Sequence, residues 1–227
     1  MSASARSGVV VAIDGPSGSG KSSTSRGVAS RLGLRYLDTG AMYRAITWWM
    51  LRYDVPVDDP EAVAKRCGEP TIVSGTDPSA PTITVDGVDV AAAIRTPEVT
   101  GAVSQVSAVP AVRARLLGLQ RAAIADALAG PGIVVEGRDI GSTVAPDATV
   151  KVYLTADAAA RAERRAAEEG GSDLAATESS LLARDRIDST RTTSPLTMAH
   201  DAVHLDTTPY SLDQVVDLIV GLVEEAS

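Results

Sequence analysis

The sequence predicts an α/β fold in which helices cover both faces of a parallel sheet. Short apolar segments rich in β-branched residues alternate along the chain with longer segments of helical periodicity. The first of these strands, residues 9–14, leads directly into a glycine-rich loop and then a helix. No repeat or low-complexity linker divides the 227 residues, a length that suits one domain with a small inserted lobe.

Composition restricts the class of protein. Hydrophobic residues make up 44% of the chain, which is typical of a globular protein, and no apolar run is long enough to span a bilayer. Residues 1–8 lack the apolar core of a signal peptide and are predicted to form a short disordered tail. Cys67 is the only cysteine, so we expect no internal disulfide and a cytoplasmic location.

The charge pattern points to small anionic ligands. The formal net charge of −8 argues against nucleic acid or an anionic membrane as the main partner. Only three of the 21 basic residues are lysines, and arginine binds phosphate bidentately where lysine acts as a point charge. A GC-rich genome that favours arginine codons is an alternative reason for this bias. We expect small-molecule substrates and a monomer.

The glycine-rich loop has the spacing of a Walker A phosphate loop, Gly-x₄-Gly-Lys-Ser, over Gly15–Ser22. Its backbone N–H groups and the following helix N-terminus would face a polyphosphate. Lys21 is predicted to reach the β- and γ-phosphates, and the Ser22 hydroxyl to bind Mg²⁺. The alternative, a turn that binds nothing, is disfavoured because strand, loop and helix occur in the required order. The sheet is therefore predicted to be of the P-loop NTPase type, and the residues expected to bind ATP here are Gly15, Pro16, Ser17, Gly18, Ser19, Gly20, Lys21, Ser22 and Ser23.

The first helix is predicted over residues 22–32, with Gly33 as its C-cap, and a short strand follows over 34–37. Asp38-Thr39-Gly40 is typical of a helix N-terminus, so the next helix is predicted over 41–53. We expect four apolar side chains of this helix to face inward, those of Met42, Ile46, Trp49 and Met50.

A loop is predicted at 54–60 and one or two helical turns at 61–67. From residue 68 the apolar residues no longer follow helical spacing and instead form short strand-like segments. Residues 71–73 and 82–85 are predicted strands, and Asp86-Gly87 is a strong hairpin signal. We interpret residues 68–95 as a small antiparallel β insertion. It is either a decoration of the fold or a lid that contributes substrate selectivity.

The second half of the chain returns to alternating strands and helices. Pro110 is favoured in the first turn of a long helix. The predicted helices are 96–107, 110–128, 156–169, 178–188 and 211–225, and the predicted strands are 133–136, 150–154 and 202–205.

Charged and hydroxyl residues follow several predicted strands, at Asp14-Gly15, Asp38-Thr39 and residues 136–139. Ligands of open parallel sheets bind beyond the carboxyl ends of the strands, so these residues should share one edge. Arg44 lies about one turn into its helix and should reach the same cleft. The alternative for the adjacent pair Arg138-Asp139 is a local structural ion pair.

Two helices after the third buried strand carry clustered arginines. The first cluster lies on one face of the helix 156–169 and consists of Arg161, Arg164 and Arg165. Such a face repels itself unless anions approach, and Gly170-Gly171 beyond it would let the segment move. The alternative is a solvated surface helix neutralised by nearby glutamates.

The second cluster, Arg184, Asp188 and Arg191, has the spacing i, i+4, i+7. A carboxylate between two guanidinium groups suits a ribose hydroxyl beside phosphates, and the alternative is a helix-stabilising network. Phosphoryl transfer needs in-line positioning and charge neutralisation, which a phosphate loop and opposing arginines provide.

Several of these segments resemble the bacterial CMP kinase family of P-loop nucleoside monophosphate kinases. The resemblance extends over almost the whole chain from Val9 onward, and the β insertion at 68–95 is similar to an extra lobe of that family. It is carried by residues 13–21, 37–44, 104–113 and 137–141 and by the spacing of Arg184, Asp188 and Arg191.

The resemblance implies an Mg²⁺-assisted transfer of a phosphoryl group from ATP to CMP or dCMP. It implies that Ser104, Arg113 and Asp139 read the cytosine, that Arg184 and Asp188 hold the ribose, and that Arg44, Arg138 and Arg191 bind the acceptor phosphate. Thr39 and Tyr43 belong to the same implied CMP site. Arg161, Arg164 and Arg165 would form a lid at about 156–172 over ATP. The implied catalytic residues are Lys21, Arg138, Arg164, Arg184 and Arg191.

Two positions depart from the family pattern. Glu136 stands where the family has aspartate, and Thr39 replaces a common serine while keeping the hydroxyl. One alternative function is a P-loop kinase of another small acceptor, UMP or a non-nucleotide. A second is a nucleotide-binding regulatory module without turnover.

Overall fold

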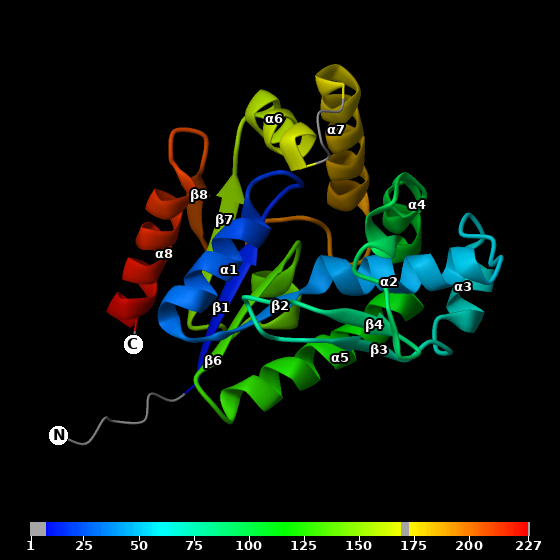
Figure 1. Cartoon of the computed structure of the whole chain (residues 1–227), viewed down its shortest axis with the longest axis horizontal. Helices are drawn as coiled ribbons and strands as arrows, with labels where there is room; N and C mark the ends of the chain where they lie inside the picture. Colours follow the sequence, from blue (N-terminus) through cyan, green and yellow to red (C-terminus); the bar gives the residue numbers. More distant parts are fainter. Residues whose placement is uncertain (1–7, 169–172, 227) are drawn as a thin grey trace.

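The computed structural model describes residues 8–168 and 173–226 (Figure 1). Residues 1–7 of the expected tail lie outside the described residues. The same holds for residues 169–172, which include the Gly170-Gly171 break expected in the lid segment. Among the described residues, no helix combines the length and apolar character needed to cross a membrane.

The centre of the molecule is a five-stranded parallel sheet of order β2-β6-β1-β7-β8. The strands are β1 (Val9–Asp14), β2 (Arg35–Asp38), β6 (Gly132–Gly137), β7 (Val150–Thr155) and β8 (Val203–Asp206). β1 and β6 are buried along their whole length, as expected for strands covered on both faces. The predicted α/β class is confirmed.

Helices cover both faces of this sheet because its strands alternate apolar side chains between two cores. Val11 and Ile13 of β1 pack with α1 (Lys21–Leu32) and α8 (Leu212–Ala226). Val10 and Ala12 pack instead into a larger core with α2 and α5. The helices of this second face are α2 (Thr39–Arg52), α4 (Pro97–Ala108) and α5 (Pro110–Leu128). The two layers hold β1 rigidly, together with the loop that follows it.

Local signals fix the end of α1 and the start of α2, which begins at Thr39, two residues before its predicted start. Gly33 ends α1 in the left-handed region with φ 66°. Asp38 caps α2 by accepting a hydrogen bond from the Ala41 N–H at 2.8 Å. The four apolar side chains predicted to face inward from α2 are all buried.

The predicted insertion is a separate three-stranded antiparallel sheet, β3 (Ile72–Ser74), β4 (Ile83–Val85) and β5 (Val88–Asp89). Asp86 and Gly87 form the predicted hairpin turn, both with positive φ. The short helix α3 (Pro60–Arg66) precedes the insertion, and a 3₁₀ turn, η1 (Ala93–Arg95), follows it. Ile83 and Val85 belong to the core that contains α2, so the insertion is anchored on that helix.

Helices α6 (Ala158–Glu168) and α7 (Leu174–Thr190) lie beyond the carboxyl ends of the strands (Figure 1). α7 begins four residues before the predicted start because the Asp173 side chain caps it, accepting from the N–H groups of Ala175 and Ala176. A π-helical turn, η2 (Ile140–Val144), follows Asp139 and was not predicted. Such turns have no sequence period that would reveal them.

Two glycines give opposite expectations for the same substitution. Gly132 begins β6 at φ 110°, and a Cβ there would lie 2.0 Å from the Val9 carbonyl oxygen. Gly118 lies inside α5 with nothing within 4 Å of such a Cβ. Gly118→Ala should raise the free energy of unfolding by about 1 kcal/mol, and Gly132→Ala should lower it by more than about 1 kcal/mol. Urea denaturation of both variants checks this, and equal effects would contradict the described backbone.

Candidate active site

The phosphate loop connects β1 to α1 and is shaped by glycines. Gly15 and Gly18 have φ of 150° and 76°, values that L residues rarely adopt. A Cβ on Gly15 would lie 2.1 Å from the Leu154 carbonyl oxygen, so only glycine fits beneath the end of β7. Lys21 folds back over the loop, and its Nζ donates to the Pro16 carbonyl oxygen at 2.7 Å. The lysine ammonium is thus held at the face of the loop.

Three predicted arginines converge on this loop from distant parts of the chain. Arg138, just after β6, donates to the Gly15 carbonyl oxygen at 3.0 Å. Arg161 of α6 donates to the Ser17 carbonyl oxygen at 3.1 Å. Arg184 of α7 donates to the Ser17 Oγ at 3.4 Å. Arg138, which follows β6, therefore meets two helical arginines at the phosphate loop.

Asp185 joins these groups and was missed in the sequence. Its Oδ1 accepts from the Ser17 backbone N–H at 3.2 Å and lies 3.5 Å from Arg138 Nη1. Its Oδ2 pairs with Arg161 Nη1. A sequence signal existed, because Asp185 and Asp188 are spaced i, i+3 and so share a helix face.

A second, buried cluster joins α5, the residues after β6 and the end of α7. Arg113 Nη2 pairs with Asp139 Oδ2, and both side chains are at most 7% exposed. Arg191 Nη2 lies 3.7 Å from Asp139 Oδ1, and Arg191 Nη1 lies 3.6 Å from Asp188 Oδ1. Arg138 Nε lies 3.1 Å from Asp188 Oδ2, which links this cluster to the phosphate loop.

Two predicted pairings are corrected by these contacts. Arg138 and Asp139 take different partners, so the alternative of a local ion pair between them does not hold. Asp188 pairs with Arg138 and Arg191, whereas the helix spacing predicted Arg184 and Arg191. The reason is tertiary, since the loop after β6 brings the Arg138 guanidinium to the face of α7.

The buried cluster retains free donors. Arg113 Nη1 donates to the Ser107 carbonyl oxygen at 3.3 Å, and its guanidinium lies 5.3 Å from the Tyr43 ring centroid. Arg113 Nε is buried with no hydrogen-bond partner in the part of the chain that the structure describes, and the same is true of Arg191 Nη2. Ser104 of α4 is buried nearby, and its carbonyl oxygen accepts from Ser107 Oγ. Orphaned donors of this kind suit a ligand with acceptor atoms.

Other predicted residues lie on α1, α2 and α6. Arg44 Nη1 donates to Thr100 Oγ1 at 2.9 Å and to the Ile94 carbonyl oxygen at 3.2 Å. Arg164 bonds to Thr207 through Oγ1 and the carbonyl oxygen, beside the loop at Gly20. Ser23 is exposed on α1. Thr39 Oγ1 donates to the Glu136 carbonyl oxygen at 2.7 Å, which ties α2 to the end of β6.

Burial, and after it the crowding of cations, lowers the pKa of several basic groups around the phosphate loop. Burial, followed by the charge of Arg138, lowers the pKa of Lys21 to about 8. Burial, followed by neighbouring arginines, also lowers the pKa of Arg44, Arg184 and Arg191. Each shift has the same meaning, that the cleft disfavours its own positive charge. An anion bound among these groups would relieve that repulsion.

Two buried carboxylates sit at strand ends. Burial raises the pKa of Asp14 to about 6 although its oxygens accept from the N–H groups of Ile140 and Gly141, both at 2.8 Å. These bonds fasten the loop that carries Arg138 and Asp139 to the end of β1. Burial and the nearby Asp38 raise the pKa of Glu136 to about 7.

Oxygen donors suited to Mg²⁺ meet beside the loop. Ser22 Oγ donates to Glu136 Oε2 at 2.9 Å, so a hydroxyl and a carboxylate face the same position. No group of three or more metal-binding side chains occurs within residues 8–168 and 173–226. Mg²⁺ commonly binds through one or two carboxylates together with substrate phosphates, and this donor set fits that mode.

Comparison with known proteins agrees with this geometry. The family model described as cytidylate kinase matches residues 11–225. The chain belongs to the cytidylate kinase family. It is 62% identical to the cytidylate kinase of Streptomyces griseus over 220 residues, which cover 97% of this chain and 94% of that protein. It is 53% identical to the cytidylate kinase of Nocardia farcinica, with 96% and 94% covered.

A solved structure supports the fold alone. An uncharacterised protein from Eubacterium ventriosum superposes with a TM-score of 0.53 at 11% sequence identity, covering 95% of this chain and 98% of that one. The family resemblance seen in the motifs is therefore confirmed by whole-chain similarity, while the roles of individual residues rest on their geometry.

The buried pair Arg113–Asp139 makes a stability prediction. Asp139→Asn leaves the buried Arg113 guanidinium without its carboxylate and removes one of the two carboxylates beside Arg191, so the free energy of unfolding should fall by about 3 kcal/mol or more. The matched control is Asp126→Asn, which breaks an exposed pair with Arg35 and should cost less than about 1 kcal/mol. Chemical denaturation measures both. Equal small losses would mean that Asp139 is not needed to neutralise the cluster.

Proposed function

We propose that the protein transfers the γ-phosphoryl group of ATP to CMP and dCMP, giving ADP with CDP or dCDP. The observation that carries this proposal is the position of Arg138. Its guanidinium bonds to the phosphate loop through the Gly15 carbonyl oxygen and pairs with Asp188 of the buried cluster. A cation at that junction faces a donor phosphate on one side and an acceptor phosphate on the other.

On the donor side, the loop amides, Lys21 and Ser22 would hold the ATP phosphates. Arg161, Arg164 and Arg165 lie on α6, and we propose this segment as a lid over ATP. Its support is the bond from Arg161 to the loop carbonyl of Ser17. Closure of such a lid excludes water and adds positive charge around the transferred group.

On the acceptor side, Arg113 can donate to N3 and O2 of cytosine, while Asp139 and Ser104 can accept from its exocyclic amine. Uracil, which carries O4 in place of the amine, would leave Asp139 facing another acceptor. Thr39 and Tyr43 of α2 would line this site, and Arg184 and Asp188 would hold the ribose.

The acceptor phosphate would bind Arg44, Arg138 and Arg191. We also propose that the insertion at 68–95 forms a wall of this site, since its sheet is anchored on α2 and its exit at Ile94 contacts Arg44.

The chemical step requires in-line placement of the two phosphates and neutralisation of the charge that spreads over the transferred group. Lys21, Arg138, Arg164, Arg184 and Arg191 are the cations proposed to supply this stabilisation. Ser22 and Glu136 are the residues that would hold Mg²⁺, which when bound neutralises phosphate charge and orients the phosphates. The carboxylates Asp185 and Asp188 keep the arginines oriented between turnovers.

The oligomeric state and the cellular location that we propose are those expected from the sequence. We propose that the protein acts as a monomer in the cytoplasm, where a lone buried thiol such as that of Cys67 stays reduced.

The proposal predicts a definite order of acceptors. ADP release from ATP should be fast with CMP or dCMP, and kcat/KM for UMP should be lower by about 10- to 100-fold, because a mismatched donor–acceptor pattern costs about 1–3 kcal/mol. AMP, GMP and shikimate should give little release.

Lys21→Ala should abolish turnover in every case while the circular dichroism spectrum stays unchanged.

Other results would contradict the proposal. Fast release with AMP and none with CMP would refute the cytosine assignment. Binding of ATP without release for any acceptor would favour a regulatory module.

A further inference from the structure

Both oxygens of the Glu136 carboxylate are held by hydroxyl groups. Ser22 Oγ donates to Oε2 at 2.9 Å, and the Tyr36 phenol donates to Oε1. The three residues come from α1, β2 and β6, so the contact depends on the tertiary fold and on no local motif. Tyr36 has no part in the donor or acceptor sites described above.

Strand register explains why these groups meet. β2 and β6 are parallel neighbours, with Tyr36 opposite Val134 and Asp38 opposite Glu136. Tyr36 and Val134 belong to the core on the α1 face of the sheet. Glu136, two residues beyond Val134, lies on that same face. The Tyr36 ring is 2% exposed, so packing fixes the position from which its hydroxyl reaches the carboxylate.

The hydrogen bond from Tyr36 fixes the orientation of the Glu136 carboxylate. A glutamate side chain has several rotatable bonds, and an unanchored carboxylate would adopt more than one rotamer. The hydrogen bond from Tyr36 occupies Oε1, which leaves Oε2 directed toward Ser22. The Ser22 hydroxyl lies in the first turn of α1 at the end of the phosphate loop, where a cation accompanying the nucleotide would lie.

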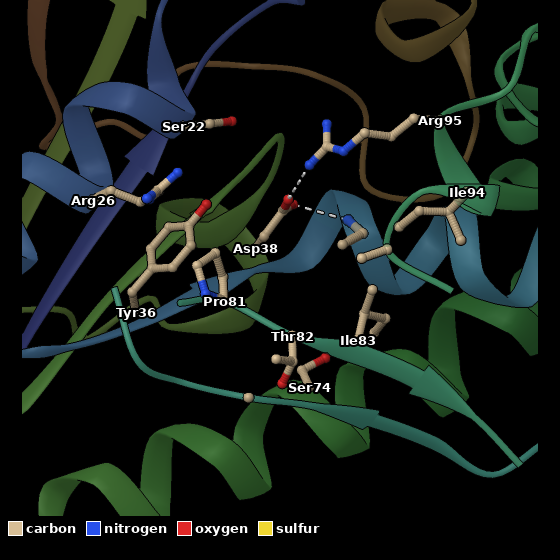
Figure 2. Close-up of a pocket in the computed structure, with 13 residues that line it drawn as sticks. Ser22, Arg26, Tyr36, Asp38, Ser74, Pro81, Thr82, Ile83, Ile94 and Arg95 are labelled. Atoms are coloured by element: carbon tan, nitrogen blue, oxygen red, sulfur yellow. Dashed lines mark hydrogen bonds and ion pairs between the residues drawn. The ribbon is translucent and has the colours of Figure 1, made fainter. Parts of the chain in front are cut away.

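A cavity opens beside the same three-residue network. It has a volume of about 90 Å³ and is lined by Ser22, Tyr36 and Asp38, with Arg26 and Arg95 at its sides (Figure 2). Arg95 Nη2 lies 3.9 Å from Asp38 Oδ2 across it. Glu136 does not line this cavity, whereas its two hydroxyl partners, Ser22 and Tyr36, do. Mg²⁺ usually keeps several of its waters when it binds to a protein, and the cavity offers space for them on the Ser22 side of the network.

We propose that Tyr36 is a positioning residue for the Mg²⁺ that accompanies ATP, acting by fixing Glu136 so that its second oxygen, Oε2, faces the Ser22 hydroxyl. This inference rests on the proposed use of Mg²⁺-ATP. It predicts that the phenolic hydroxyl changes how strongly Mg²⁺ and ATP reinforce each other on the enzyme, with no direct contact to either.

The test measures the coupling between Mg²⁺ and ATP binding by calorimetry, with no acceptor present. The dissociation constant of ATP is determined with and without Mg²⁺, and the ratio of the two gives the coupling. Loss of a residue that orients a metal ligand typically weakens metal affinity by about 10- to 100-fold. In Tyr36→Phe the coupling should therefore fall by about 10-fold, while the dissociation constant of CMP stays within about twofold of wild type.

A double-mutant cycle separates positioning from general damage. Glu136→Gln should reduce the coupling by itself, and adding Tyr36→Phe to that background should have no further effect, because the phenol acts only through the carboxylate. Tyr53→Phe is the matched control, since it removes the same hydroxyl from an exposed ring that stacks on Trp49. Thermal denaturation of each variant reports any loss of folding.

Two results would overturn the inference. One is an unchanged coupling in Tyr36→Phe, and the other is an equal further loss in the wild-type and Glu136→Gln backgrounds. Failure of the proposed function is a separate result, because it would appear as the absence of CMP-dependent ADP release in the unaltered enzyme.

Discussion

The site depends on a balance of charge inside a buried cleft. Three aspartates, Asp139, Asp185 and Asp188, pair there with four arginines, Arg113, Arg138, Arg161 and Arg191. Buried guanidinium groups are tolerated only when carboxylates or hydrogen bonds compensate for lost hydration. The aspartates do this incompletely, as the lowered pKa values of Lys21, Arg44 and Arg184 indicate. The cleft is thus organised to accept further negative charge.

The sheet makes that crowding possible. A parallel sheet puts the carboxyl ends of its strands at one edge, and here the groups after β1, β2 and β6 meet there. Asp14 adds a specific constraint, because its carboxylate accepts hydrogen bonds from the backbone N–H groups of Ile140 and Gly141. These bonds fix the position of the loop that carries Arg138 and Asp139. Packing of two cores against β1 keeps this frame rigid. Rigidity matters because positioned charges stabilise a transition state only if they need not reorganise.

Much of this arrangement follows from local sequence. The phosphate loop, the Asp38 cap, the Asp86-Gly87 hairpin and the alternation of strands and helices each have a short-range physical cause. Helical spacing predicted that Arg184, Asp188 and Arg191 share one helix face; Arg184 and Asp188 do lie on α7, whereas Arg191 follows the helix with an extended backbone. The choice of partners could not be predicted in this way, and Asp188 pairs with Arg138 instead of Arg184 because a loop from β6 reaches α7.

The same limit applies to the residues that sequence reasoning missed. Asp185 and Tyr36 gain their significance from contacts across 168 and 100 residues of chain. The π-helical turn after Asp139 depends on Asp14, which lies 126 residues earlier. Glu136 departs from the family pattern, and its two hydroxyl partners, Ser22 and Tyr36, could be identified only from the pairing of β2 with β6 and the position of α1. Strand register and loop position are set by the tertiary structure, and the contacts of this site depend on both.

Burial and neighbouring cations disfavour the charged form of Lys21 until nucleotide phosphates bind, and proton linkage tests this most directly. The pKa of Lys21, about 8, should rise when phosphates approach, because an anion favours the charged form. Calorimetric titration of ATP at pH 8, in buffers of different ionisation enthalpy, should therefore show uptake of about half a proton per ATP. This uptake should be lost in Lys21→Met. Release of protons, or no exchange in the unaltered protein, would contradict the account.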